Sequence, residues 1–342
     1  MNHQKIYLLL FFILGFYLKV SAYTIEKIGI EQGLSNNNII SITQDREGFI
    51  WIATKDGLNR FDANSFKIFR SSENDTNTIS SNVLNCVYAD KNDDIIWIAT
   101  EKDGLNAYHY KTNTFKLYRH DYSSENNNSI IENGVTDISS DSKGNLWLAT
   151  YQGGLDFFDK KTGNFIHYNQ SNIKGLGSNY NWSLMVDNDN TIYAGHVNSG
   201  FSIVNLKTKT AVHFTHNPGD PHSLANNTVT CIFKDSKNNI WLGTRNGLSL
   251  FNPKTYKIKN FRNDPDNPSS LSHNFIQKIT ESKDQKLWIG TEGGGVNILD
   301  LNSFSKADDP KQVAFKHIGS SKTPDGLSSG SVQAIFQDSF GN

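Results

Sequence analysis

The sequence is built on one motif that returns six times. Its anchor is an aromatic residue inside a short apolar stretch, tryptophan in five copies and tyrosine in one. The anchors are Trp51, Trp97, Trp147, Tyr193, Trp241 and Trp288, at intervals of 46, 50, 46, 48 and 47 residues. An internal repeat of this length has the size of one four-stranded propeller blade. The repeat therefore constrains the fold more than any other feature.

Each copy contains four short segments with the composition of β-strands. In the first copy these are residues 39–43, 49–53, 58–61 and 66–69, separated by turns rich in Asp, Gly and Asn. Alternating apolar residues, many of them β-branched or aromatic, favour strands paired through tight turns. No window of the repeats shows a sustained helical period, which disfavours an α-helical solenoid. The sequence predicts an all-β fold, a seven-bladed β-propeller with four-stranded blades of about 47 residues.

A seventh copy begins at Ser331, and the sequence reaches Asn342 before the anchor of that copy. We therefore expect residues 23–342 to form one propeller, with six complete repeats and a truncated seventh blade, as a fragment of a longer protein. Residues 25–35 are similar to residues 315–328. The N-terminal segment is accordingly expected to close the ring as an outer strand of the last blade.

Residues 1–22 have the pattern of a secretory signal peptide. Lys5 precedes an apolar run from Ile6 to Leu18, and Val20 and Ala22 are the small residues expected before a cleavage site. The run is too short for a membrane-spanning helix, which needs about 20 residues. The expected location is the periplasm. Because Lys19 lies close to the cleavage site, an uncleaved form tethered to the membrane is the alternative.

Charge and cysteine content exclude other classes of protein. The chain has 33 Lys and Arg against 34 Asp and Glu, so it lacks the basic surplus of an electrostatic nucleic-acid binder. No Cys and His cluster has metal-ligand spacing, and neither a metal nor a cofactor is expected. Cys86 and Cys231 share one register in copies two and five, nearly opposite each other on a ring. Both thiols should therefore be free and buried.

The repeated pattern Asp-x-x-Gly-x-[Ile/Leu]-Trp-[Ile/Leu]-[Ala/Gly]-Thr resembles the two-component-regulator propeller repeat. Gly33-Leu34-Ser35, ahead of the first copy, is also similar to that family. The resemblance covers essentially the whole mature chain and implies the periplasmic sensor region of a hybrid two-component histidine kinase. It implies a homodimeric parent protein with a second propeller, a β-sandwich, a membrane helix and a kinase as C-terminal partners. It assigns no enzymatic activity to this chain.

The aspartates that recur in the turns are candidates for chemistry, but we interpret them as structural. Asp45, Asp141, Asp187 and Asp235 each stand six residues before an anchor, and Asp in a turn hydrogen-bonds its own backbone. Three arginines at equivalent ends of outer strands lie too far from the axis to converge on one substrate; these are Arg70, Arg119 and Arg262. No catalytic residue is predicted.

A ligand is expected at the end of the propeller where two sets of loops meet. The connections into the innermost strands are rich in Asn, for which turn formation is the simpler explanation. The turns between second and third strands vary from copy to copy, and their amides, charges and aromatic rings suit sugar hydroxyls. The predicted ligand-binding residues are Lys55, Asp56, Glu101, Lys102, Tyr151, Gln152, Tyr180, Trp182, His196, Arg245, Asn246 and Glu292.

Trp182 departs most from its column, in which Ile40, Thr136 and Thr230 stand in other copies. Its ring is either a platform that stacks on a sugar or a packing replacement, and the sequence leaves both open. The leading hypothesis is a sensor propeller that binds an oligosaccharide without chemical change. The alternatives are a secreted propeller enzyme that acts on glycans, as a lyase or glycosidase, and a scaffold for protein–protein interaction.

Overall fold

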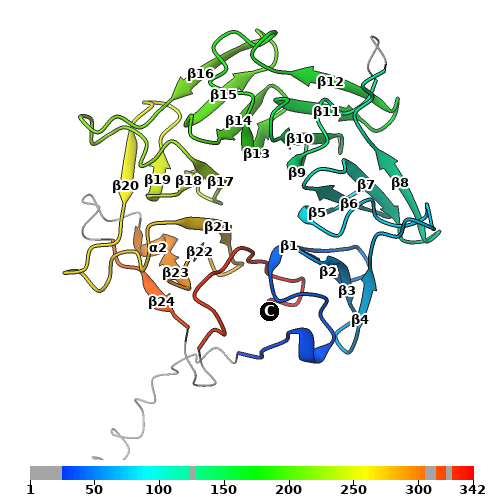
Figure 1. Ribbon diagram of the computed structural model, residues 1–342. Helices are drawn as coiled ribbons and strands as arrows, with labels where there is room; N and C mark the ends of the chain where they lie inside the picture. The colour runs from blue at the N-terminus through cyan, green and yellow to red at the C-terminus, as the bar shows by residue number, and fades with distance from the viewer. Residues whose placement is uncertain (1–24, 124–127, 305–312, 321–325) are drawn as a thin grey trace, which may run out of the picture.

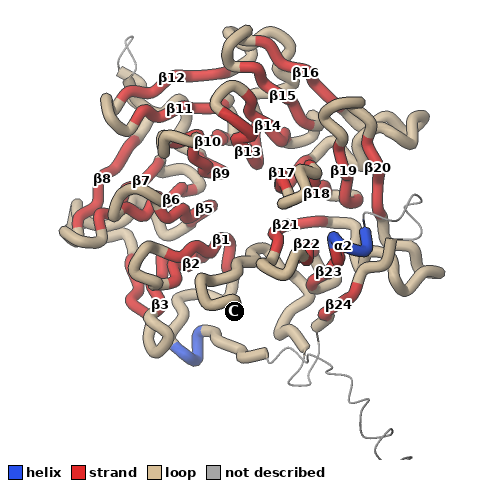
Figure 2. The backbone as a smooth tube through the Cα atoms, turned by 180° about the vertical axis from the view of Figure 1, so that it is seen from behind, coloured by secondary structure: helices blue, strands red, loops and turns tan. Residues whose placement is uncertain are grey.

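The computed structural model describes residues 25–123, 128–304, 313–320 and 326–342. The expected signal peptide lies outside these residues. The described part forms six four-stranded antiparallel sheets, the blades, arranged in a ring about one axis (Figure 1). In each blade the strand that comes first in the sequence lies nearest the axis, and the fourth strand forms the outer wall (Figure 2). No described helix is both long and apolar enough to span a membrane.

The strands follow the chain blade by blade. Blades one to three contain β1 (Ile39–Gln44), β2 (Ile50–Thr54), β3 (Gly57–Phe61), β4 (Phe66–Phe69), β5 (Leu84–Ala89), β6 (Ile95–Thr100), β7 (Leu105–His109), β8 (Thr114–Tyr118), β9 (Val135–Ser140), β10 (Leu146–Thr150), β11 (Leu155–Asp159) and β12 (Asn164–Tyr168). Blades four to six contain β13 (Asn181–Asn188), β14 (Thr191–His196), β15 (Phe201–Asn205), β16 (Thr210–Phe214), β17 (Val229–Lys234), β18 (Ile240–Thr244), β19 (Gly247–Phe251), β20 (Ile258–Phe261), β21 (Ile276–Glu281), β22 (Lys286–Thr291), β23 (Val296–Asp300) and β24 (Lys316–Ile318). The two short helices are the 3-10 helix η1 (Ile30–Gln32) and α2 (Leu301–Phe304).

The predicted propeller of four-stranded blades is confirmed, and the strands expected in the first copy agree with β1 to β4 within one residue at each end. The expected count of seven blades is wrong for the described chain, which forms six. Residues 331–342 occupy the position of a seventh innermost strand, because Val332 donates to the Thr291 carbonyl and Ser339 to the Gln44 side chain. This segment thus touches blades six and one, without further described strands beside it.

The N-terminal segment does not form the expected outer strand. Residues 25–29 have no strand conformation, and only η1 precedes blade one. A strand needs a neighbour that accepts its hydrogen bonds, and no third strand of a seventh blade is described for it to join. The N-terminal segment and residues 326–342 both lie between blades one and six (Figure 1).

The hydrophobic core is divided into layers between neighbouring blades. Trp51 packs with Leu84 and Tyr108 between blades one and two, and Trp241 packs with Leu271 and Ile289 between blades five and six. Equivalent layers lie between the other neighbouring blades from two to five. The anchor of blade six, Trp288, is only half-buried, because residues 331–342 alone lie where a further sheet would cover it.

Three of the four predicted turn aspartates cap their own turns, whereas Asp187 pairs with Lys234 of the next blade instead. Asp235 accepts two backbone N–H bonds within its own turn, at 2.9 and 2.8 Å, and binds the indole Nε1 of Trp241 at 2.8 Å. Asp45 serves Trp51 in the same way, and Asp90 serves Trp97. In blades one, two and five the carboxylate therefore ties a turn to the buried anchor of its blade.

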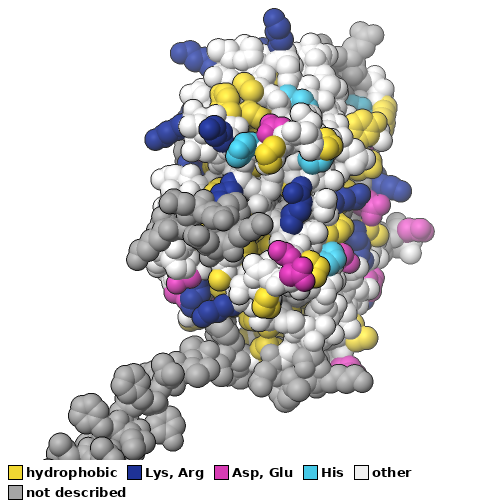
Figure 3. Space-filling view, turned by 90° about the vertical axis from the view of Figure 1, so that its left-hand side faces the viewer, with side chains coloured by type: hydrophobic (Ala, Val, Ile, Leu, Met, Phe, Trp, Pro, Cys, Tyr) yellow, Lys and Arg dark blue, Asp and Glu magenta, His cyan; other side chains and the backbone are white. Residues whose placement is uncertain are grey.

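The outer wall carries no dominant patch on the side of β20 and β24. Lys, Arg, Asp, Glu and His side chains are mixed there with isolated hydrophobic ones (Figure 3). Single exposed apolar residues of this kind are normal for soluble proteins.

Candidate ligand-binding rim

The two loop sets meet at one end of the propeller, as predicted. We call this end the rim, formed by residues 55–56, 101–104, 151–154, 197–200, 245–246 and 292–294 together with the connections into the innermost strands. Backbone hydrogen bonds join the two sets from blade to blade: Gly57 donates to the Asn82 carbonyl at 2.8 Å, and Gly154 donates to the Asn179 carbonyl at 3.0 Å. The rim is thus continuous from blade one to blade six.

The Asn column is structural. Besides its carbonyl contact, Asn82 accepts the N–H of Ser71 on its side-chain oxygen at 2.8 Å, and Asn179 accepts that of Gln170 at the same distance. Asn133, Asn227 and Asn274 repeat the arrangement. The side-chain oxygens and backbone carbonyls of these residues, the Asn staples, are therefore already engaged in holding neighbouring loops together.

Three aromatic side chains form an exposed arc over blades three and four. Tyr151 follows β10, Tyr180 precedes β13, and Trp182 is the second residue of β13. Their exposed fractions are 42%, 45% and 41%. The two tyrosine rings meet edge to face with centroids 5.9 Å apart. The arc presents apolar ring faces to solvent at the rim, although large aromatic side chains are usually buried in proteins.

Trp182 owes its exposure to a β-bulge. Every innermost strand of the six blades shifts register after its first residue, and the bulge residues are Ile40, Asn85, Thr136, Trp182, Thr230 and Gln277. Three of them donate a hydrogen bond to the next blade: Asn85 to the Val135 carbonyl, Thr136 to that of Asn181 and Thr230 to that of Ile276. An indole at this position gives up that bond between blades.

The remaining predicted residues form pairs around the rim. Lys55 of blade one and Glu101 of blade two form an ion pair at 3.7 Å. Asp56 is bound by Arg70 at 2.8 Å, which lowers the pKa of its carboxyl. Lys102, Gln152 and Asn246 are exposed.

Blades five and six contribute a second group to the rim. The guanidinium of Arg245 lies 5.7 Å from the ring centroid of Phe275. The carboxylate of Glu292 accepts bonds from Gln277 at 2.5 Å and Ser331 at 2.9 Å.

His196 does not belong to the rim surface, which corrects the prediction. It ends β14 with no exposed area and bonds Asn181 through Nδ1 at 2.9 Å and Ser202 through Nε2 at 2.8 Å. Burial, with a smaller effect of His213, lowers the pKa of His196 to about 3. It stands where other blades have a buried Thr bonded to a glycine carbonyl, as Thr54 is to Gly57. Its neutral ring is therefore part of the core.

Below the rim, the residue after each bulge belongs to a ring around the axis. These residues are Ser41, Cys86, Asp137, Ser183, Cys231 and Lys278, opposite Ala or Gly on the second strand. Both cysteines are free as predicted; Cys231 is buried, whereas Cys86 is half-buried. Burial raises the pKa of Cys86 to about 12 and that of Cys231 to about 11. Sequence analysis did not single out Asp137 or Lys278.

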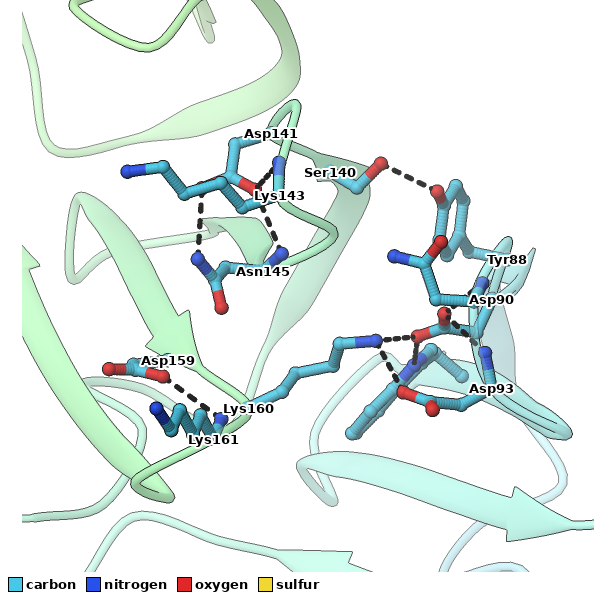
Figure 4. Close-up of polar contacts among 12 residues, drawn as sticks. Tyr88, Asp90, Asp93, Ser140, Asp141, Lys143, Asn145, Asp159, Lys160 and Lys161 are labelled. Carbon is cyan, nitrogen blue, oxygen red and sulfur yellow. Dashed lines mark hydrogen bonds and ion pairs between the residues drawn. The ribbon is translucent and has the colours of Figure 1, made fainter.

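A hollow of about 370 Å³ lies at the opposite end, between blades two, three and four. Lys160 of blade three reaches Asp90 and Asp93 of blade two there, at 2.6 and 2.7 Å, and Tyr88 binds Ser140 (Figure 4). Other carboxylates of this hollow are also engaged: Asp187 by Lys234, and Asp189 by the Ser142 hydroxyl. None of the predicted site residues lines it.

The described residues include no group of three or more His, Cys, Asp or Glu side chains that could hold a metal ion. The exposed groups of the rim are aromatic rings, amides and charged side chains, only some of which are paired. This chemistry suits non-covalent recognition of a polar ligand with apolar faces.

Four segments of the chain match the family described as two component regulator propeller: residues 33–56, 129–152, 223–246 and 270–293. Histidine kinase P4 of Formosa agariphila is 29% identical over 195 residues, which is 55% of this chain and 14% of that protein. The chain thus spans a small part of the curated relative.

Solved structures share the fold. The extracellular domain of a protein described as a hybrid two component system from B. thetaiotaomicron is 39% identical, with a TM-score of 0.81, over 93% of this chain and 40% of that one. A second extracellular domain from the same organism, described as part of a one component system, reaches 0.70 at 23% identity over 94% of this chain and 41% of that one. Virginiamycin B lyase from Staphylococcus aureus has a TM-score of 0.56 at 14% identity over 78% of this chain and 82% of that one, a likeness of fold alone.

Proposed function

Because this chain belongs to the two-component-regulator propeller family, we propose that it is an extracellular, periplasmic ligand-sensing module of a transmembrane sensor and that its ligand is an oligosaccharide. The 39% identity to an extracellular domain over 93% of the chain supports the sensor role. The chain spans 40% of that extracellular domain. We propose in addition that the parent sensor has a second propeller, a β-sandwich and a kinase as C-terminal parts and acts as a homodimer.

The aromatic arc is the observation that carries the choice of ligand. Sugar rings have an apolar face that stacks on aromatic side chains and hydroxyls that need hydrogen-bond partners. Tyr151, Tyr180 and Trp182 offer the stacking faces, and Gln152 and Asn246 offer amides on the same rim. Since the Asn staples and the paired charges maintain the loops, the arc is free to contact a ligand without loss of structure.

The test measures binding of a panel of tetrasaccharides to the purified chain by calorimetric titration. Trp182→Thr restores the residue that blades three and five have at the bulge, so the fold should be kept. Loss of one stacked ring should weaken binding roughly 5- to 150-fold, by analogy with the 1–3 kcal/mol measured for base stacking. Ile166→Thr, an exposed apolar residue on β12, is the matched control and should leave the affinity unchanged.

Three results would count against the proposal. Absence of binding to every saccharide, with a co-purifying protein in its place, would favour a scaffold. New reducing ends or unsaturated products after long incubation would favour an enzyme. Equal affinity of wild type and Trp182→Thr, both fully folded, would remove the arc from the site.

A further inference from the structure

Two cations at the junction of blades five and six form no ion pair with any residue that the structure describes. Arg245 follows β18, and its guanidinium stacks over Phe275, just before β21. Lys278 lies three residues beyond Phe275, within β21, and is exposed on a strand whose neighbours Ile276 and Ile279 are buried. Among the described residues, no carboxylate lies within 4.0 Å of either cation.

Most other charged side chains near the rim form ion pairs or hydrogen bonds within the protein, and Lys102 is the exposed exception among the predicted residues. Arg70 binds Asp56 and Arg119 binds Asp103, at 2.8 and 3.2 Å, while Lys55 pairs with Glu101. The two remaining carboxylates nearby are engaged by neutral donors. Glu292 accepts from Gln277 and Ser331, whereas Asp137 accepts the N–H groups of Ile138 and Leu184 at 3.0 Å each. Apart from Lys102 of blade two, the described rim cations without a carboxylate within 4.0 Å therefore lie in blades five and six.

The register of β21 directs Lys278 toward the axis. The bulge at Gln277 places Lys278 in the axial ring, one residue below the rim. The groups whose charge acts on it come from other innermost strands: Asp137 of β9, Cys86 of β5 and Cys231 of β17. Burial raises the pKa of both thiols and keeps them protonated. Asp137 is therefore the one acidic group of this ring that can offset the positive charge of the Lys278 ammonium. The Lys278 side chain is exposed to solvent, although charged or ionisable groups of three other innermost strands act on its ammonium.

We propose that Arg245 and Lys278 bind anionic substituents, carboxylate or sulfate, of an acidic oligosaccharide whose sugar rings stack on the aromatic arc. This inference rests on the proposed function and deepens it. Arginine presents a planar fork of donors that matches such groups, and stacking on Phe275 holds the fork in place. Lysine supplies a point charge deeper in the mouth. An extended ligand would span from blades three and four to blades five and six.

The test compares three probes of four sugar rings: oligogalacturonate, its neutral methyl ester and a sulfated galactose oligomer. We expect the wild-type chain to bind at least one acidic probe tenfold or more tightly than the ester, with affinity falling as salt rises. Arg245→Gln and Lys278→Met should each lower the acidic affinity about tenfold and leave the ester unaffected. Lys278→Arg should restore binding. Lys91→Met, at the opposite end of the propeller, is the control.

The outcomes separate the two proposals. Preference for the carboxylate or for the sulfate, lost in both variants, supports the inference and identifies the substituent. Equal binding of ester and acidic probes, unaltered in folded variants, overturns the inference and leaves the sensor proposal standing. Absence of binding to the whole panel, the neutral tetrasaccharides included, overturns both. Thermal melts confirm that Lys278→Met is folded; where it is not, Arg245→Gln and Arg245→Lys decide.

Discussion

Replacement of Asp235 by Ala should destabilise the propeller through loss of one carboxylate that serves four donors. Asp235 is buried and binds the backbone N–H groups of Lys237 and Asn239, the side-chain amide of Asn239 and the indole of Trp241, all within 2.8–2.9 Å. Hydrogen bonds to a charged group contribute about 1.5–3 kcal/mol each, and their losses are not additive. Because the turn amides regain water whereas the indole does not, we expect a total loss of roughly 3–5 kcal/mol.

Asp141 provides an internal comparison for this experiment. It caps its own turn through Lys143 and Asn145 as Asp235 does, but no bond joins it to Trp147 in the described structure. Asp141→Ala should therefore cost about 1–3 kcal/mol less than Asp235→Ala. The difference measures the bond between carboxylate and indole. Asp235→Asn keeps one acceptor oxygen and should fall between wild type and Asp235→Ala.

Urea unfolding followed by tryptophan fluorescence measures these differences from the midpoints at a common slope. Equal losses for Asp235→Ala and Asp141→Ala would refute the argument, because the indole bond would then contribute nothing. Retention of full stability in Asp235→Ala would refute the structural assignment of the whole turn column.

Three further perturbations follow from the described contacts. Lys160→Met should lower the free energy of unfolding in urea by roughly 2–4 kcal/mol, since it leaves the buried Asp90 without its cation. The wild type should lose stability in acid, because Lys160, against the opposite effect of burial, lowers the pKa of the Asp90 carboxyl. The pKa of His196 is lowered to about 3 in the folded protein, so its ring stays neutral there, whereas the unfolded chain takes up a proton below about pH 6.5. The free energy of unfolding should therefore decline as the pH falls from about 6.5 toward 3. Thermal melts of His196→Thr should show a smaller decline, and an unchanged slope would contradict this. Iodoacetamide at pH 8 should label neither Cys86 nor Cys231 in the native protein, whereas both react in urea; rapid native labelling of either thiol would show that it is accessible and ionised.

Most of the fold could be predicted from the repeat because each blade packs against the next through residues at the same positions of its repeat. Residues were missed or misplaced where one copy departs from the pattern of the others. Asp90 binds its anchor from seven residues away instead of six, since the turn of blade two is longer, and it was therefore missed. His196 was placed on the rim by its neighbours in sequence, although its column holds buried Thr in other blades.

The site was less predictable because it depends on contacts between blades. Arg245 meets Phe275 across 30 residues of sequence, which no local pattern indicates. Lys278 points to the axis because a bulge interrupts the strand's alternation, and alternation is the signal that sequence analysis uses. Trp182 could be singled out from the sequence because the alignment of the copies places it at a position where other copies have Ile or Thr.

The Asn staples have a consequence for how such domains diversify. They join blades through backbone carbonyls, glycine N–H groups and a single side-chain amide, as Asn82 does with Gly57 and Ser71. Turn side chains outside these contacts, such as Lys102 and Gln152, are exposed and do not hold the blades together. One blade can exchange its turn residues while the other five keep theirs, so recognition can be altered in small independent steps. Related chains that bind other ligands should therefore differ first at these turns, while the residues that join the blades stay the same.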